Sequence, residues 1–196
     1  AIISIKKSKL ANLELIENPR ERGSHGTLLW VLDQCKTSMG SRKLKEFIKN
    51  PLINKEEILH RQSHVEYFMD EIIIREEIKD KLKEVYDIER LIGKIILGTE
   101  NGRDLIALKK SLSSSLGIGN ILGEKIVKID RNLLCEIYEK IEKTIVEEPP
   151  FSVREGGMIK QGIDSELDEL HNISRTGKDC ILDIENKEKE RTGIKT

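Results

Sequence analysis

The sequence that decides the fold is EEPPFSVREGGMIKQGIDSELDELHNISRTGKDCILDIENKEKER, residues 147–191. Its Pro149-Pro150 pair ends any helix that precedes it, because proline lacks the amide proton that a helix interior needs. Asp164 is a good helix N-cap residue, and from there to Thr192-Gly193 only Gly177 interrupts a helical pattern. We therefore predict a helix of roughly 28 residues, on the order of 40 Å long, which is longer than a compact domain of this size needs.

Apolar positions in this predicted helix alternate three and four residues apart, which is the spacing of a coiled-coil seam. After Ile184 the sequence is polar on every face, as in a helix that bridges domains or awaits a partner. Gly177 costs about 1 kcal/mol relative to alanine in a helix interior, and this cost is compatible with close packing against a neighbour there. The seam positions are Leu167, Leu170, Ile173 or Ser174, Gly177, Cys180 or Ile181, and Ile184.

Shorter helices are predicted upstream, where capping residues precede apolar stripes of helical spacing. In one of them, Asn54 and Glu57 have the spacing of a reciprocal capping pair. Helices of roughly 10 to 17 residues joined by short turns predict an all-α fold, a multi-helix bundle from which the C-terminal helix protrudes. The predicted starts are Thr37-Ser38, Asn54, Asp87, Asn101, Asp130 and Asp164.

Four other stretches carry specific expectations. The apolar cluster at 27–32 predicts a short helix that is buried on most sides. The serines and glycines within 113–119 predict a break in the helix that starts at Asn101, because glycine weakens a helix interior. Residues 2–5 are compatible with a short strand, and the polar residues 18–26 with a loop.

Composition limits the classes of function. Charged residues make up 35% and aromatic residues 4% of the chain, which indicates helices packed by aliphatic side chains. The net charge of -1 argues against an unaided nucleic-acid binder, since such affinity comes from neutralising phosphates, although a local basic face stays open.

No apolar run approaches the roughly 20 residues that span a bilayer. There is no signal peptide or initiating Met, so the chain reads as a piece of something longer.

The candidate chemical groups are few. Three distant cysteines, Cys35, Cys135 and Cys180, indicate a reduced, cytoplasmic protein in which each fills a small apolar space. His60 and His64 lie four residues apart and would share one helix face, as metal ligands can, but without a third ligand they are more simply two partly exposed histidines.

Two segments, Glu147-Glu148-Pro149-Pro150 and Arg154-Glu155-Gly156-Gly157, could be read as an acid–base site with a glycine-rich loop. A structural interpretation is simpler, because the prolines stop a helix and the glycines permit a positive φ. The sequence also lacks a Gly-x-x-x-x-Gly-Lys-Ser/Thr phosphate loop. We therefore predict no catalytic, cofactor-binding or metal-binding residue in this chain, and residues that contact DNA are not identified.

A series of short blocks follows in order along the chain. The blocks are LLWVLD at 28–33, CKTSMGSR at 35–42, NPL at 50–52, DIERL at 87–91, LG at 97–98, EPP at 148–150, EGGMIK at 155–160, ELDEL at 166–170 and ERTGIKT at 190–196. This series resembles the core domain of the MutS DNA mismatch-repair family. Each block is short, but together they extend in order over roughly residues 14–196, which makes the resemblance specific.

The resemblance implies a helical core with levers. It divides the chain into a connector remnant and linker at 1–23, a helical core at 24–162, and a lever helix at 163–196 that leads to a clamp domain gripping the DNA backbone. The clamp, the mismatch-reading Phe-x-Glu motif and the P-loop ATPase domain of the family are not in this sequence.

The family also implies a homodimeric parent protein that binds ATP, Mg and mismatched duplex DNA and works with repair partner proteins. We therefore expect this chain to have no enzymatic activity of its own and no cofactor. Its implied role is mechanical, coupling the DNA clamp to the ATPase domain.

Three other interpretations stay open. A recombination-type member of the wider family would share this scaffold, and a generic helical interaction module would make the blocks coincidental. A nucleic-acid-binding unit would show duplex binding that depends steeply on salt. Its candidate lysines are Lys6, Lys7, Lys9, Lys43, Lys45 and Lys49.

Overall fold

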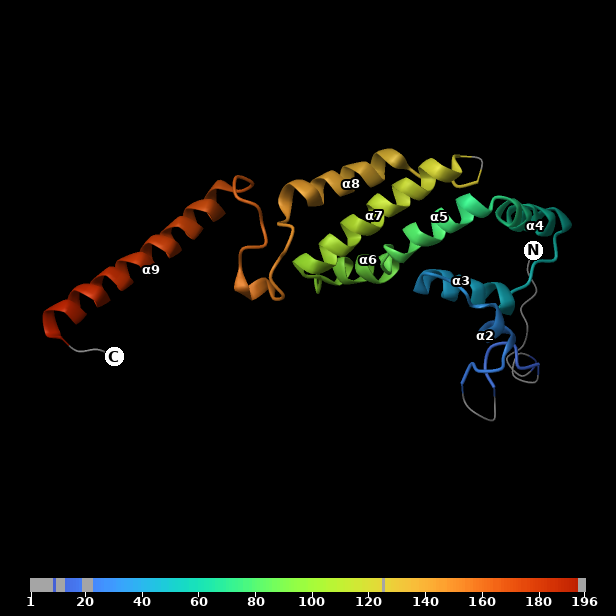
Figure 1. Ribbon diagram of the computed structural model, residues 1–196, viewed down its shortest axis with the longest axis horizontal. Coiled ribbons are helices and arrows are strands. Elements are labelled where there is room, and N and C mark those ends of the chain that lie inside the picture. Colours follow the sequence, from blue (N-terminus) through green and yellow to red (C-terminus); the bar gives the residue numbers. More distant parts are fainter. Residues whose placement is uncertain (1–8, 10–12, 19–22, 125, 194–196) are drawn as a thin grey trace.

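The structure, a computed structural model, describes residues 9, 13–18, 23–124 and 126–193 (Figure 1). Among them, β-pairing is limited to isolated bridges and the regular elements are helices, so the predicted all-α fold is confirmed. The strand expected at 2–5 lies outside the described residues. The helices are α2 (Leu28–Leu32), α3 (Ser38–Lys49), α4 (Lys55–Asp70), α5 (Ile72–Lys83), α6 (Ile88–Leu97), α7 (Gly102–Leu122), α8 (Arg131–Thr144) and α9 (Ser165–Thr192), with a 3-10 turn η1 (Val153–Glu155).

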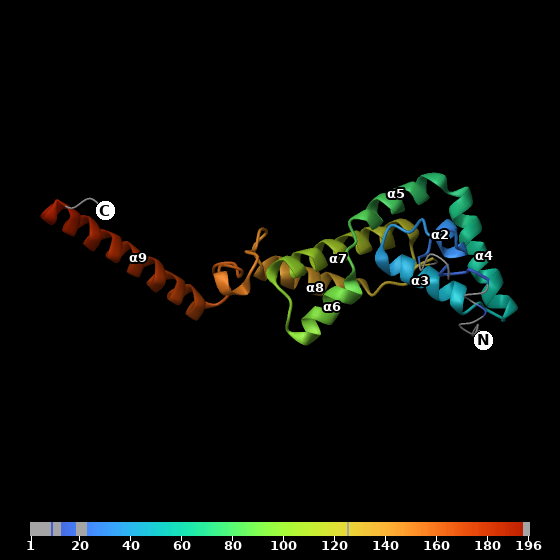
Figure 2. The ribbon, with the colours of Figure 1, turned by 90° about the horizontal axis from the view of Figure 1, so that it is seen from below.

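The core lies around α7, which packs against α5, α6 and α8. Leu108 and Leu112 of α7 are buried against Leu91 of α6 and Ile141 of α8, and Ile145 just beyond α8 completes the cluster. Figures 1 and 2 show these four helices side by side in the middle of the molecule. Burial of aliphatic side chains by neighbouring helices is the main source of stability in such a bundle.

The predicted helix starts are confirmed by N-cap hydrogen bonds, in which a side-chain oxygen accepts from a backbone N–H two or three residues on. Asn101 forms a complete capping box with Asp104. At the other end of α6, Gly98 adopts φ 63°, which ends the helix. The other capping side chains are Thr37, which accepts from Gly40 N, Asn54 from Glu57 N, Asp87 from Arg90 N, Asp130 from Leu133 N, and Asp164 from Leu167 N.

The break predicted within 113–119 is wrong, because α7 runs without interruption from Gly102 to Leu122. The hydroxyl of Ser115 donates to the carbonyl of Ser111 at 2.8 Å, so this serine is satisfied within the helix. At Gly119 an added Cβ would lie 2.6 Å from Cδ1 of Ile129. The glycine therefore makes room for a packed segment, and the packing offsets its weak helix propensity.

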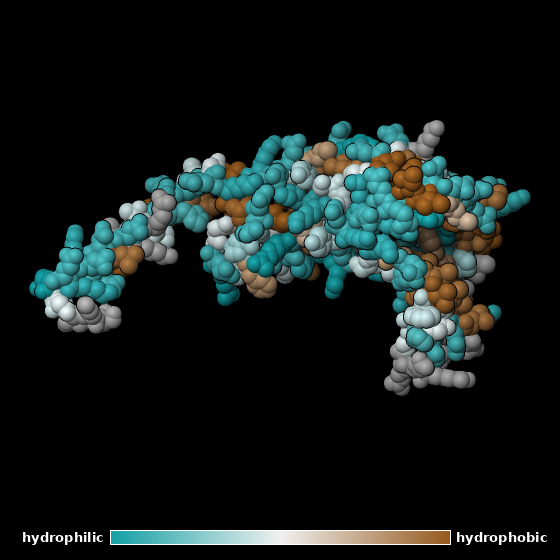
Figure 3. Space-filling view, in the orientation of Figure 1, coloured by the Kyte–Doolittle hydropathy of each residue, from teal (hydrophilic) through white to brown (hydrophobic). Residues whose placement is uncertain are grey.

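The apolar cluster at 27–32 forms helix α2 as predicted, with Thr27 as its N-cap. The predicted burial on most sides is wrong, because only Thr27 and Leu29 of this cluster are buried and Trp30 is 50% exposed. α2 packs beside α3 at the end of the molecule far from α9, where no other described helix covers its outer face. Figure 3 shows apolar residues gathered at this end.

Helix α9 has the predicted length of 28 residues and ends at Gly193, whose φ is 70°. In both views it extends away from the bundle (Figures 1 and 2). The division into 1–23, 24–162 and 163–196 stays a prediction. Across the part of the chain that the structure describes, every helix is too short or too polar to cross a bilayer.

Candidate functional site at the base of the long helix

The candidate site is the connection between α8 and α9, because it fixes the base of the protruding helix. Ile145 and Ile159 form an antiparallel β-bridge. Val146 N donates to the Met158 carbonyl at 3.0 Å, and Lys160 N donates to the Thr144 carbonyl at 2.8 Å. The chain that leaves α8 is thus tied to the chain that returns toward α9.

Two lysines reinforce this connection through Glu142 of α8. Lys160 Nζ donates to the Glu142 carbonyl at 2.5 Å. Lys109 Nζ of α7 donates to Glu142 Oε2, also at 2.5 Å. The hydrogen bond from Lys109 holds the pKa of the Glu142 carboxyl below its usual range. These contacts join α7, α8 and the segment before α9.

The same connection packs closely onto the start of α7 at Gly102. A Cβ added to Gly102 would lie 2.5 Å from Cβ of Pro149 and 2.9 Å from Cγ of Met158. Arg103 Nε donates to the Pro149 carbonyl at 3.3 Å. A glycine at the first position of α7 is therefore required for the connection to lie where it does.

The turn before α9 has the structure expected of its glycines and prolines. Gly156 and Gly157 have φ of 71° and 73°, a region that glycine adopts without strain. Glu155 accepts from Ser152 N at 2.9 Å within a capping box of η1. The carboxylate proposed for acid–base chemistry thus has a structural partner, which favours the structural interpretation of this segment.

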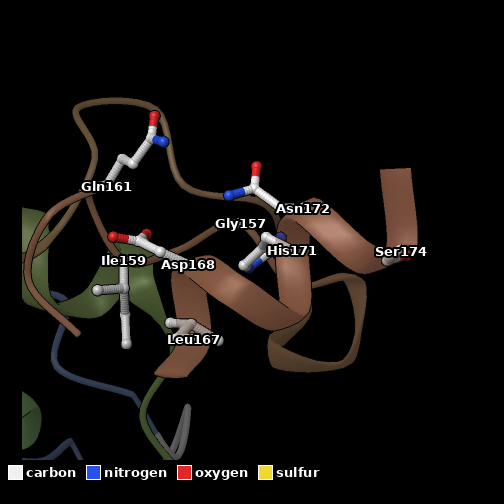
Figure 4. A pocket seen from close by; sticks show the side chains of 8 residues that line it. All are labelled: Gly157, Ile159, Gln161, Leu167, Asp168, His171, Asn172 and Ser174. Atoms are coloured by element: carbon white, nitrogen blue, oxygen red, sulfur yellow. The ribbon is translucent and has the colours of Figure 1, made fainter. Parts of the chain in front are cut away.

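An open hollow of about 410 Å³ lies where the connection meets α9 (Figure 4). Asp168 accepts from Gly162 N at 2.8 Å, which fastens the preceding turn to the first turn of α9. Figure 4 shows the loop arching over the first turns of α9, with Asp168 and Asn172 on the helix beneath it. The arrangement sets the direction of α9. The hollow is lined by Gly157, Ile159, Gln161, Leu167, Asp168, His171, Asn172 and Ser174.

The predicted seam of α9 is exposed beyond its first position, Leu167, which is half-buried. Leu170 is 58% exposed and Ile181 is 66% exposed. Among the α9 residues whose side chains are described, none is buried. The close neighbour considered for Gly177 is not found, because no described atom lies within 4 Å of an added Cβ. A coiled-coil seam with this exposure fits a helix whose partner lies on another segment.

The histidines and cysteines do not form a site in the part of the chain that is described. His60 and His64 share a face of α4, with ring centroids 4.4 Å apart, but no group of three or more metal-ligating side chains occurs among the described residues. Cys35 and Cys135 are exposed, so the prediction that each fills an apolar space is wrong for these two. The side chain of Cys180 lies outside the description.

The candidate DNA-contacting lysines are only partly described, since Lys6 and Lys7 lie outside the described residues. Lys9, Lys45 and Lys49 are exposed. Lys43 forms an ion pair with Glu46 one helical turn away, at 2.9 Å, so its charge is balanced within α3.

Sequence reasoning missed a polar contact between α3 and α6. Arg42 binds the Asp87 carboxylate with two hydrogen bonds, of 2.7 and 2.8 Å, and also pairs with Glu89. Ser38 Oγ donates to the same carboxylate at 2.9 Å. The only sequence signal for this contact was the opposite charge of the blocks at 35–42 and 87–91. No spacing pattern in the sequence links residues that are 45 positions apart.

Comparison with known proteins identifies the family. Residues 9–192 match the family model of MutS domain III. The chain belongs to the MutS domain III family. It is similar to a protein named DNA mismatch repair protein MutS from Fusobacterium nucleatum, at 51% identity over 99% of this chain and 22% of the relative.

Relatives of the same name in other bacteria are similarly close to this MutS domain III chain. The protein from Acetivibrio thermocellus is 46% identical over 94% of this chain and 22% of the relative. The one from Halalkalibacterium halodurans is 42% identical over 100% of this chain and 23% of the relative. The chain thus spans about a fifth of the length of the curated relatives it matches.

Membership of the MutS domain III family explains where the sequence blocks lie in the fold. The EPP and EGGMIK blocks meet at Gly102, where Pro149 and Met158 pack. The CKTSMGSR and DIERL blocks meet at the Arg42–Asp87 contact. The blocks therefore mark contacts between elements.

Proposed function

We propose that this chain is the core and lever section of a DNA mismatch repair protein, in which α9 couples a DNA-gripping part mechanically to an ATPase part. The observation that carries the proposal is the match to MutS domain III over residues 9–192, in a chain that spans about a fifth of relatives named DNA mismatch repair protein MutS. An ATPase site and a DNA clamp would belong to the longer protein.

The architecture supports a mechanical role in two ways. The base of α9 is tied to α7 and α8 by Lys160, Glu142 and the Ile145–Ile159 bridge. The rest of α9 projects from the bundle with its seam exposed (Figure 1). A helix that is fixed at one end and has an exposed apolar seam along its length is suited to transmit motion between parts that have discrete arrangements.

The partners follow from this role. In the proposal, mismatched duplex DNA, ATP and Mg bind to other parts of a homodimeric parent, and repair partner proteins act with that parent in the cytoplasm. This chain contributes no catalytic group of its own. The names of the relatives favour repair over the recombination-type alternative.

The first experiment titrates this chain with fluorescent duplexes that differ only by one mismatch. We expect equal, weak and salt-sensitive binding to both duplexes, because the mismatch reader and the clamp would lie outside the chain. Tight, mismatch-selective binding by the chain alone would contradict the assignment to a coupling section.

The second experiment places this chain, in frame, in the corresponding region of the Fusobacterium nucleatum relative. The chimaera should restore a low spontaneous mutation rate to a bacterium that lacks its own MutS. Asp179→Pro should abolish that rescue, because proline in a helix interior costs about 3 kcal/mol or more and kinks the rod. Asp179→Ala is the matched control and should rescue normally. A chimaera that folds and hydrolyses ATP but gives no rescue would favour the recombination-type alternative.

A further inference from the structure

Helix α3 has little apolar anchorage. Every residue of α3 is described, and none is buried. Its neighbour α2 has one buried side chain, Leu29. Residues 50–54, which contain Pro51, connect α3 to α4, so the unit made of α2 and α3 is joined to the bundle through a short non-helical linker. The apolar residues Leu44, Phe47 and Ile48 of α3 are half-buried, so polar contacts contribute to holding the unit in place.

The polar contacts of this unit with α6 converge on Asp87, the N-cap residue of α6. In Figure 1, α3 lies near the start of α6. Asp87 Oδ2 accepts from Arg42 Nη1 at 2.7 Å and from Ser38 Oγ at 2.9 Å. Asp87 Oδ1 accepts from Arg42 Nη2 at 2.8 Å and from the backbone N–H of Arg90 at 3.3 Å. One carboxylate thus caps α6 and holds α3 by a two-pronged guanidinium contact, a geometry that fixes orientation as well as distance.

We propose that Arg42 is a releasable latch that holds the α2–α3 unit, defined as residues 28–49, against the start of α6. The Arg42 side chain is 47% exposed, so water and salt compete with the contact and can release it. When Arg42 leaves, Asp87 still caps α6 and the bundle stays intact. Ser38 then holds the start of α3 by a single hydrogen bond, so the unit gains freedom to move. The Asp87 and Glu89 carboxylates share this one guanidinium and would repel each other without it.

A second contact provides the pivot. The Arg61 guanidinium of α4 lies 3.7 Å from the ring centroid of Phe47, near the C-terminal end of α3. Cation–π contacts of this kind persist at partly exposed sites. Phe47 lies close to the linker at 50–54, whereas Ser38 and Arg42 lie in the first half of α3. Release of the latch would therefore swing the N-terminal end of α3 about its C-terminal end.

The chain carries natural positions for measuring this motion. Cys35 lies in the segment between α2 and α3, Cys135 lies on α8, and both are exposed. With Cys180→Ser removing the third thiol, spin labels on Cys35 and Cys135 report the distance from the unit to the bundle. The probe is the labelled full chain with no added ligand.

Four samples test the latch: the parent with the Cys180→Ser change, and the same protein with Arg42→Gln, Arg42→Lys or Lys43→Gln. We expect a narrow distance distribution in the parent and a broad one in Arg42→Gln. Arg42→Lys keeps the positive charge but loses the planar guanidinium that makes two parallel hydrogen bonds. The width of its distance distribution should therefore be intermediate. Lys43→Gln removes an ion pair with Glu46 and a cation–π contact with Phe47, both within α3, and its distance distribution should match that of the parent.

Amide exchange separates release of the latch from unfolding. In Arg42→Gln, amides of α3 should exchange at least several-fold faster, while those of α7 keep the rate of the parent. If the α7 amides of Arg42→Gln also exchange faster, the parent protein in 1 M salt is used as the test sample instead. At that concentration exposed charges are strongly screened, so the distance distribution should broaden. The proposal is overturned if Arg42→Gln changes neither the distance distribution nor the exchange rate of the α3 amides. Where the parent at 1 M salt is the test sample, a distance distribution that does not broaden overturns it.

Discussion

The bundle and the long helix of this chain are both built from amphipathic helices, but they satisfy their apolar faces differently. In the bundle, Leu112 of α7 is 4% exposed and is enclosed by α6 and α8. In α9, Leu170 holds an equivalent place on an apolar stripe and is 58% exposed. The same pattern of side chains therefore yields a core in one region and an open seam in the other.

The difference shows that the spacing of apolar residues determines which face of a helix is apolar. Whether that face is buried depends on the segments that pack against it. The chain supplies neighbours for α7 from both sides. For α9, the residues that the structure describes supply contacts at the base only, through the turn at Gly162 and the bridge at Ile145. Three predictions test this contrast, from the largest expected effect to the smallest.

The largest difference is expected between Leu112→Ala and Leu170→Ala. Truncation of a buried leucine leaves a cavity and should lower the free energy of unfolding by about 2 to 5 kcal/mol. Truncation of the exposed leucine should change it by no more than about 0.5 kcal/mol. Urea denaturation followed by far-UV circular dichroism measures both. Equal losses would mean that α9 is covered in solution.

The two glycines Gly102 and Gly177 should respond to alanine with opposite signs. In Gly102→Ala the new Cβ meets Pro149 at 2.5 Å, and such overpacking costs about 1 to 3 kcal/mol. In Gly177→Ala the methyl group enters open space, and alanine stabilises a helix interior by up to about 1 kcal/mol. Thermal melts with the helical signal at 222 nm distinguish the two. A destabilising Gly177→Ala would reveal a neighbour against that face.

The smallest effect concerns the pH dependence of Asp87. The hydrogen bonds from the Arg42 guanidinium hold the pKa of Asp87 well below its usual range. Because the folded-state pKa is depressed, the stabilisation is present above the unfolded pKa of about 3.9 and is lost as pH falls through the folded pKa. The free energies of unfolding of the wild type and Asp87→Asn should therefore differ most above about pH 5, and the difference should shrink below about pH 4.

Asparagine is the suitable replacement at position 87, since it still caps a helix while it removes the negative charge and one of the two acceptor oxygens. Asp80→Asn is the matched control, because the pKa of Asp80 is lowered by Lys83 of the same helix. It should show a weaker pH-dependent difference, as expected of an exposed pair within one helix. A pH-independent difference for Asp87→Asn would show that its pairing with Arg42 does not stabilise the fold.

Helix starts could be predicted from the sequence because capping is local. Asn101 and Asp164 bond to amides three residues away, so their effect is contained in the stretch where they occur. The continuity of α7 could not be predicted in this way. It depends on Ile129, which packs beside Gly119 after the chain has turned toward α8.

Within the candidate site, the turn at Gly156 and the start of α9 were predictable, whereas the contacts that hold them were not. The Ile145–Ile159 bridge and the packing on Gly102 require segments that meet only in three dimensions. The exposure of α2 was missed for a related reason. A cluster of apolar residues such as Leu28–Leu32 indicates a surface to be covered, but not whether the chain covers it.

The length of α9 also amplifies any rotation at its base into a larger displacement at its far end. At 1.5 Å per residue its 28 residues measure about 42 Å, so a rotation of about 10° at the base displaces the far end by about 7 Å. Rearranged contacts around Lys160 would give a rotation of this kind at the base of α9. At the tip it becomes a displacement comparable to a turn of helix, and the rigidity of the base decides how faithfully that small change is reproduced there.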